Sequence, residues 1–346
     1  MRKFGRLLKR RAKVMTTNLI DSIDTKKRLA TQGADYEAPA QVIVRGLIKR
    51  YGDLTAVAGV SFEVRRGEVF GLLGPNGAGK TTTVEIIEGL RPRDGGEVAV
   101  CGFDPAENVK EVKKRIGVAL QATALPDKIE VREALALFAG LYPMGRGGRA
   151  DIDRLLRTVS LEEKAKSRFD TLSGGQRQRL AVALALVNEP EVVILDEPTT
   201  GLDAQARREL HDVIERLKSE SKTVILTTHY IEEAERLCDR VAIVDHGRVI
   251  AAGTPRELIS GSRGQSRIEL RTARPVELAE LRLIPFVESV TESGGAYSLR
   301  SPDAPRALVE LVKWMEAERH ELLDLHVTRP TLEDTFIELT GKRIRE

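Results

Sequence analysis

The sequence predicts an α/β fold with a mainly parallel sheet, and three observations lead to this prediction. The apolar stretch Val69–Leu73 runs directly into a glycine-rich loop. A second apolar stretch, Val192–Leu195, ends at two acidic residues and has the pattern of a strand buried on both faces. Strand patterns alternate with helical patterns between these stretches and beyond them. Strands connected through helices lie side by side and parallel in one sheet.

Order is expected to begin near residue 41. A helix is predicted from Lys80 to just before Gly89, because glycine commonly follows the last turn of a helix. Residues 127–170 have a mainly helical pattern, with a break at Gly145–Gly148. The strands predicted in this half, in order, are Val42–Val44, Val60–Val64, Val69–Leu73, Glu97–Val100 and Ile116–Leu120.

The next helix is expected to begin at Asp203, a residue suited to cap the N-terminus of a helix. Its apolar residues fall on one face at helical spacing, which predicts packing against the sheet: Ala206, Leu210, Val213, Ile214 and Leu217. The elements that follow are a strand at Thr223–Leu226, a helix at Ile231–Leu237, a strand at Val241–Val244, a hairpin turn at Asp245–Gly247 and a strand at Val249–Ala251.

A polar linker, Ser262–Gln265, precedes a second pattern. Its order of strand, helix, two strands, helix and strand is typical of a small ferredoxin-like domain. The elements are Arg267–Arg271, Pro275–Leu283, two strands around Gly294–Gly295, Pro305–Glu318, Leu322–Val327 and a final helix at Leu332–Leu339. We therefore expect an N-terminal extension over residues 1–40, a main domain over 41–260 and an accessory α+β domain over 266–346.

The basic character of the chain is confined to its first residues. The formal net charge is +3, and residues 1–13 hold seven lysines and arginines and no acid, which leaves −4 for the rest. The main domain is therefore not expected to bind nucleic acid. Three interpretations of the extension stay open: a short helix with Phe4, Leu7 and Leu8 on an anionic membrane surface, a solvated tail, or a start of translation at Met15.

Membrane-spanning and secretory signals are not found in the sequence. The longest apolar run, Leu180–Val187, is far shorter than the ~18 residues of a membrane helix. No apolar segment of the signal-peptide kind follows the basic start, and the two cysteines, Cys101 and Cys238, lack metal-type spacing. The sequence thus predicts an intracellular protein that does not itself cross a bilayer.

A phosphate-binding loop is predicted at residues 74–82. The residues fit the pattern G-x4-G-K-[ST] between a strand and a helix, in which backbone N–H groups face phosphate oxygens. Lys80 is expected to contact the β and γ phosphates of a nucleotide, and Thr81 to hold Mg²⁺. The loop consists of Gly74, Pro75, Asn76, Gly77, Ala78, Gly79, Lys80, Thr81 and Thr82.

The acidic pair that ends the apolar strand at 192–195 is expected beside this loop. Asp196 would lie at the carboxyl edge of the sheet, where open α/β sheets bind ligands, and would orient Mg²⁺ through water. Glu197 can act as the general base that polarises an attacking water. The alternative is an ordinary helix-capping cluster within residues 196–200.

A second anion site is predicted at residues 172–176. Ser173 and the glycine pair open a helix, so that a hydroxyl and free N–H groups face outward. One nucleotide in one subunit needs only the first site, whereas a head-to-tail dimer uses both, with Ser173 of one subunit facing the γ-phosphate on Lys80 of the other. The alternative is a plain loop before a helix. The residues are Leu172, Ser173, Gly174, Gly175 and Gln176.

These motifs, in this order, resemble the ATP-binding-cassette (ABC) ATPase family over residues 41–255. The resemblance implies a P-loop NTPase core with an antiparallel β subdomain and a helical subdomain at about residues 121–178. It identifies residues 172–176 as the signature motif. Four further residues gain roles from it: Gln121 as a Mg²⁺ sensor that contacts the membrane partner, Asp203 in the loop that crosses the dimer interface, His229 as the histidine that contacts the γ-phosphate, and Tyr51 as the aromatic that stacks on adenine.

The resemblance also implies an activity and its partners. These are Mg²⁺-dependent ATP hydrolysis, an ATP-dependent dimer with itself or a homologous subunit, and a separate integral membrane permease on whose cytoplasmic side the chain sits peripherally. The segment 327–336 resembles the C-terminal domain of exporter ATPases of the daunorubicin-resistance-like group, which pair with ABC-2-type permeases. An exporter of a drug, lipid or other hydrophobic compound is therefore expected. An importer ATPase and a soluble nucleotide-gated module remain alternatives.

Overall fold

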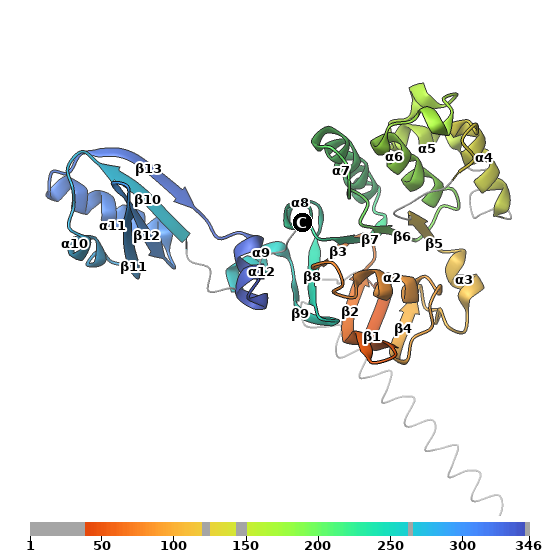
Figure 1. The fold of residues 1–346 in the computed structure, drawn as a ribbon, viewed down its shortest axis with the longest axis horizontal. Helices are drawn as coiled ribbons and strands as arrows, with labels where there is room; N and C mark the ends of the chain where they lie inside the picture. The colour runs from red at the N-terminus through yellow and green to blue at the C-terminus, as the bar shows by residue number, and fades with distance from the viewer. Residues whose placement is uncertain (1–38, 120–124, 143–150, 262–265, 343–346) are drawn as a thin grey trace, which may run out of the picture. The chain divides into compact units, whose positions relative to one another are not determined.

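The computed structural model of the protein describes residues 39–119, 125–142, 151–261 and 266–342, and it shows the predicted α/β fold (Figure 1). Gln121, the glycine-rich break at 145–148 and nearly all of the basic extension lie outside the described residues. None of the described helices combines the length and apolarity that a bilayer crossing requires.

The central sheet has six strands in the order β5-β6-β7-β3-β8-β9. All neighbours are parallel except β8 and β9, which form the predicted hairpin. Every residue of β3 and β7 is buried, as continuous apolar runs predict for strands covered on both faces. The strands are β3 (Val69–Leu73), β5 (Ile116–Ala119), β6 (Val192–Asp196), β7 (Thr223–Thr228), β8 (Arg240–Asp245) and β9 (Arg248–Gly253).

A separate antiparallel sheet has the order β2-β1-β4, from Leu54–Arg65, Ala40–Tyr51 and Gly95–Val100. Both β1 and β2 are much longer than the sequence pattern predicted. Register shifts within their pairing, including one around Gly46, break the alternation of apolar and polar residues. The bulge is held by the hydroxyl of Ser61, which accepts the N–H of Gly46 at 2.8 Å.

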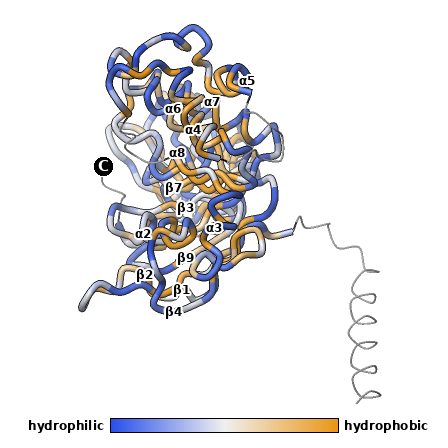
Figure 2. Tube along the Cα trace, turned by 90° about the vertical axis from the view of Figure 1, so that its right-hand side faces the viewer, coloured by the Kyte–Doolittle hydropathy of each residue, from blue (hydrophilic) through white to orange (hydrophobic). Residues whose placement is uncertain are grey.

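Helices cover the central sheet. Apolar residues gather around β3 and β7 in Figure 2. The described residues of the segment 127–170 are mainly helical, as predicted, with two α-helices and two single 3-10 turns. The helices are α2 (Lys80–Ile87), α3 (Val109–Lys113), α4 (Val131–Leu141), α5 (Ile152–Thr158), α6 (Gly174–Ala185), α7 (Ala204–Ser219), α8 (Ile231–Leu237) and α9 (Pro255–Gly261).

The C-terminal sheet has the order β11-β12-β10-β13 with all neighbours antiparallel, which is the ferredoxin-like arrangement that the sequence predicted. Its apolar cluster draws only on this segment. Helix α10 starts later than predicted, at Leu278, and before it the N–H of Val276 donates to the hydroxyl of Tyr297. The elements are β10 (Ser266–Thr272), α10 (Leu278–Arg282), β11 (Ser289–Ser293), β12 (Ala296–Ser301), α11 (Ala304–Ala317) and β13 (Leu322–Thr328).

The last helix, α12 (Leu332–Thr340), packs elsewhere than the rest of the C-terminal segment. Leu332 and Phe336 are fully buried in the apolar cluster of the main domain, where α12 contacts α8 and α9. The sequence pattern groups this helix with residues 266–346. Such a pattern identifies the apolar face of a helix, but it does not identify the surface against which that face packs.

Candidate functional site

The loop at residues 74–79 is pressed between neighbouring backbones, and two of its glycines make this possible. A Cβ on Gly74 would lie 2.1 Å from the carbonyl oxygen of Val244, and one on Gly79 would lie 2.4 Å from that of Ala56. Gly79 also has a φ of +99°, which side-chain-bearing residues rarely adopt. The glycines therefore let the loop curl over the end of β3 and open helix α2.

The ammonium group of Lys80 is buried inside this loop. Its Nζ donates to the carbonyl oxygens of Gly74 at 2.7 Å and Pro75 at 3.1 Å, and it lies 3.1 Å from Oε1 of Glu197. Lys80 is only 4% exposed. A positive charge held at the N-terminus of α2, beside backbone N–H groups, makes an anion site.

Three oxygen-bearing side chains meet at the carboxyl end of β6. The hydroxyl of Thr81 donates to Oδ1 of Asp196 at 3.4 Å, and the hydroxyl of Thr227 donates to the same oxygen. A hydroxyl and a carboxylate are hard ligands, and Mg²⁺ commonly takes one or two protein ligands together with waters and phosphates. The residues present therefore fit a Mg²⁺ ion.

Glu197 has an unusual backbone, with a φ of +45°. Its N–H donates to the hydroxyl of Thr227 at 2.9 Å and so holds this conformation. Its carboxylate lies between Lys80 and His229, whose Nδ1 is 3.2 Å from Oε2 without the alignment of a hydrogen bond. The hydroxyl of Thr200 donates to the same Oε2 at 3.3 Å. Strained positions of this kind are concentrated at functional sites.

His229 is positioned by a buried network behind it. The hydroxyl of Thr228 donates to Oε2 of Glu233 at 2.7 Å, and Nε2 of His211 lies 3.1 Å from Oε1. Burial raises the pKa of Glu233, but hydrogen bonds from His211 and Thr228 outweigh burial and leave this pKa below its usual range. The network thus contains an ionised carboxylate that fixes the chain at His229.

One cavity of about 780 Å³ brings the predicted loop, Glu197, His229 and Tyr51 together. The ring of Tyr51 is 39% exposed, and the guanidinium of Arg91 lies 5.4 Å from its centre. The cavity is lined by Tyr51, Leu54, Ala56, Asn76, Gly77, Gly79, Lys80, Thr81, Thr82, Glu197, Thr200, Arg207, His229 and Tyr230.

Five of these residues were not predicted as site residues from the sequence: Leu54, Ala56, Thr200, Arg207 and Tyr230. The guanidinium of Arg207 lies 4.4 Å from the ring centre of Tyr230, and the buried Nε of Arg207 has no hydrogen-bond partner among the described residues. The available signal was their spacing, since Arg207 follows Asp203 by one helical turn and Tyr230 follows His229 directly. An arginine in a helix carries no motif of its own.

The predicted second anion site does not line this cavity. Ser173 caps α6, because its hydroxyl accepts the N–H of Gln176 at 3.3 Å while the side chain of Gln176 accepts the N–H of Ser173 at 3.0 Å. Asp203 also lies outside the cavity lining and caps α7, accepting the N–H of Ala206 at 2.8 Å. One subunit therefore holds the loop and the signature residues apart.

Comparison with known proteins identifies the family. The ABC transporter domain model matches residues 57–200. The Nod factor export ATP-binding protein I of Burkholderia pseudomallei (strain 1710b) is 42% identical over 86% of this chain and 95% of its own length. The linearmycin resistance ATP-binding protein LnrL of Bacillus subtilis (strain 168) is 37% identical over 86% and 97%. The chain belongs to the ABC transporter ATP-binding proteins.

Solved structures support the same assignment for the main domain. The ATP-binding subunit of an ABC transporter is 31% identical, with a TM-score of 0.56 over 63% of this chain and 91% of its own. The dimeric structure of a bacterial ABC transporter cassette is 28% identical, with a TM-score of 0.54 over 62% and 98%. As a member of this family, the chain binds ATP and hydrolyses it.

Proposed function

We propose that this ABC ATPase is the energy-supplying subunit of an exporter and drives a separate ABC-2-type membrane permease. The similarity to the two relatives extends over 86% of the chain, well beyond the cassette motifs at 57–200, so it includes the C-terminal segment. One relative is named for Nod factor export and the other for linearmycin resistance. The exported compound is accordingly a drug, a lipid or another hydrophobic molecule.

The positions of the side chains in and beside the cavity support a catalytic role for each of them. Lys80 and the N–H groups of the loop bind the β and γ phosphates of ATP. Thr81 and Asp196 would hold Mg²⁺, which would supply positive charge to neutralise the phosphates. Glu197, held between Lys80 and His229, accepts a proton from the attacking water, and His229 contacts the γ-phosphate and fixes the orientation of Glu197.

The separation of the two anion sites supports a dimer as the active form. The N-terminus of α6, with Ser173, lies outside the cavity of its own subunit and can serve the cavity of another. A similar cassette has been solved as a dimer. ATP bound at Lys80 of one subunit would join Ser173 of the other, and hydrolysis would remove that link. The partner is a second copy of the chain or a homologous subunit.

An apolar cavity away from the ATP site supports a permease contact. It measures about 270 Å³ and lies at the ends of α2 and α4 beside β5. Leu90 and Tyr142 on its lining are 58% and 38% exposed, which is unusual for large apolar side chains grouped in one hollow. We infer that a cytoplasmic segment of the permease occupies it. Its lining residues are Glu88, Leu90, Lys113, Ile116, Gly117, Val118, Phe138, Tyr142, Leu184 and Ala185.

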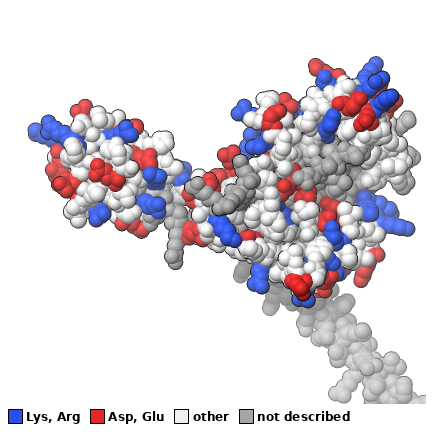
Figure 3. Space-filling model, in the orientation of Figure 1, with Lys and Arg blue, Asp and Glu red and all other residues white. Residues whose placement is uncertain are grey.

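The surface charge fits a protein partner better than nucleic acid. Figure 3 shows lysine and arginine interspersed with aspartate and glutamate over the visible face of the described residues. Nucleic-acid-binding proteins gather basic residues on one face. The chain is expected to lie at the cytoplasmic surface of the membrane through its permease.

The catalytic assignment is tested by Glu197→Gln. Loss of the general base is expected to lower the ATPase rate about 10²- to 10⁴-fold while ATP binding is kept. The ATPase rate and the Kd for ATP are measured side by side. The same substitution at an exposed residue of α8, Glu232→Gln, is the matched control. Turnover of Glu197→Gln at the unsubstituted rate would remove Glu197 from this role.

The exporter assignment is tested by purifying the full chain from its native membrane in mild detergent and identifying the bound integral membrane protein. An ABC-2-type permease is the expected result. An importer-type permease would move the chain to the import class. Recovery of the chain without any membrane protein would favour the soluble nucleotide-gated module.

A further inference from the structure

The C-terminal helix α12 is anchored on the domain that binds ATP. At its start, the N–H of Thr331 donates to the carboxylate of Asp334 at 2.8 Å. The N–H of Asp334 donates in turn to the hydroxyl of Thr331 at 3.2 Å. Leu332 and Phe336, one turn apart, are 0% and 1% exposed and belong to the apolar cluster of the main domain. Burial of these two apolar side chains against the main domain therefore docks the helix, and Phe336 is the larger of the two.

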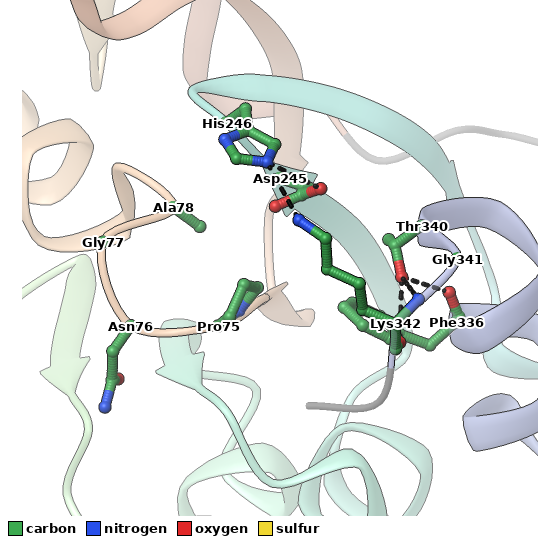
Figure 4. A pocket seen from close by; sticks show the side chains of 10 residues that line it. All are labelled: Pro75, Asn76, Gly77, Ala78, Asp245, His246, Phe336, Thr340, Gly341 and Lys342. Atoms are coloured by element: carbon green, nitrogen blue, oxygen red, sulfur yellow. Dashed lines mark hydrogen bonds and ion pairs between the residues drawn. The ribbon is translucent and has the colours of Figure 1, made fainter. Parts of the chain in front are cut away.

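The end of α12 reaches the turn between β8 and β9. Gly341 has a φ of +72°, and its N–H donates to the carbonyl oxygen of Ile337 at 2.8 Å, which ends the helix. In the next residue, Nζ of Lys342 lies 3.4 Å from Nε2 of His246 at the tip of the turn (Figure 4). The side chain of His246 is 79% exposed, so this contact is a weak one.

The same turn is bonded to the phosphate-binding loop. The N–H of Gly247 donates to the carbonyl oxygen of Ala78 at 3.0 Å, and its own carbonyl oxygen accepts the N–H of Ala58 in β2 at 2.7 Å. A Cβ on Gly247 would lie 2.7 Å from the carbonyl oxygen of Ala56, so only glycine allows this approach. The turn is therefore wedged between the loop and β2, and it fixes the carbonyl of Ala78.

An open cavity of about 940 Å³ lies beside these contacts. In Figure 4 the loop residues Pro75–Ala78 form one side, and the end of α12 forms the other. Side chains leave this space open. Among the described residues, the contacts that hold the loop on this side therefore come from the β8–β9 turn. The cavity is lined by Pro75, Asn76, Gly77, Ala78, Asp245, His246, Phe336, Thr340, Gly341 and Lys342.

We propose that α12 and the β8–β9 turn form a brace that positions the phosphate-binding loop for ATP, with Phe336, Lys342 and His246 as positioning residues. The brace holds Ala78 through Gly247, and so reduces the ordering that the loop must undergo when phosphates bind. Because coupling between two sites is reciprocal, ATP also strengthens the docking of α12. The brace acts on ATP binding and is independent of which compound is exported.

The weak contact is tested in the full chain with Lys342→Ala. The Kd for ATP and the KM of ATP hydrolysis are expected to rise about two- to fivefold, in line with an exposed charged contact, while kcat at saturating ATP stays unchanged. Lys342→Arg keeps a cation at the same place and restores both constants. The exposed Lys313 of α11, changed to alanine, is the matched control. A change in kcat with an unaltered KM would contradict a positioning role.

The strong contact is tested with Phe336→Ala, read by hydrogen exchange of the amides at 332–341 together with the Kd for ATP. Release of α12, seen as faster exchange, is expected to raise the Kd about tenfold. Release of α12 with an unchanged Kd would overturn the proposal. In the unsubstituted chain, ATP is expected to slow exchange across 332–341, and identical exchange with and without ATP would overturn it as well.

Discussion

The acidic side chains of Glu197 and Glu88 lie in opposite electrostatic environments, the first beside a cation and the second buried near other acids. Glu197 lies 3.1 Å from the ammonium of Lys80, and this keeps a base next to the phosphate site. Glu88, at the end of α2, is 3% exposed and has no hydrogen bond from its carboxyl group to a described residue. Burial, with the charges of Asp196 and Glu85, raises its pKa to about 8. The burial of Glu88 beside the apolar cavity could not be predicted from the residues next to it in the sequence.

Glu88 gives a prediction for stability against pH. The native chain keeps this proton up to about pH 8, whereas the unfolded chain releases it near 4.5, so stability falls as pH rises between these values. Glu88→Gln is expected to remove this contribution, which has a slope of up to about 1.4 kcal/mol per pH unit. Urea denaturation from pH 5 to 8, without nucleotide or Mg²⁺, measures it. Parallel pH curves for both chains would contradict the raised pKa.

Motif residues were predictable one by one, because a phosphate loop and an acidic pair after a buried strand have few other uses. The structure places Lys80, Thr81, Asp196, Glu197 and His229 close together, as those motifs imply. Arg207 was not predictable, since it enters the cavity only through its packing over Tyr230.

At the scale of elements, Asp203 is a helix cap in the structure and a proposed residue of the dimer interface. Its carboxylate accepts the N–H of Ala206 at 2.8 Å and caps α7, as its place before the helix predicted. Asp203→Ala is expected to lower the free energy of unfolding by about 0.5–2 kcal/mol, measured by urea denaturation. The exposed Arg208 of the same helix, changed to alanine, is the control.

Asp203→Ser separates the cap from the proposed role at the dimer interface. Serine also caps helices, so stability is expected to remain close to that of the unsubstituted chain. A fall in ATPase rate with unchanged stability would support the interface role, whereas an unchanged rate would leave Asp203 as a cap alone.

Element boundaries followed the sequence where burial is continuous and departed from it where bulges occur. Strands β3 and β6 lie at or within one residue of their predictions, because apolar runs define them, and helix α8 has the predicted bounds. Strands β1 and β2 are each 12 residues long, far beyond the predicted segments, because bulges shift the apolar alternation. The packing of α12 on the main domain depends on tertiary contacts that periodicity does not encode.

At the scale of the whole molecule, the subunit has one anion site in its cavity, at Lys80, and the N-terminus of α6 with Ser173 lies outside that cavity. The cavity that holds Lys80, Glu197 and His229 contains no residue from 172–176. The capped N-terminus of α6 is shaped by Gly175, where a Cβ would lie 2.5 Å from that of Ala206, so α6 and α7 approach closely. Family membership and the head-to-tail dimer were both predicted from sequence motifs, and this separation supports the proposed dimer.

The pairing of two subunits around ATP is tested most directly by the solution mass of Glu197→Gln, measured by light scattering with and without ATP and Mg²⁺. The account predicts twice the mass of one chain when ATP is present, and one chain mass without it. Adding Ser173→Arg, which places a long cation where the γ-phosphate of the other subunit should sit, is expected to abolish the ATP-dependent form. A Glu197→Gln chain that binds ATP and keeps the mass of a single subunit at high concentration would contradict the account.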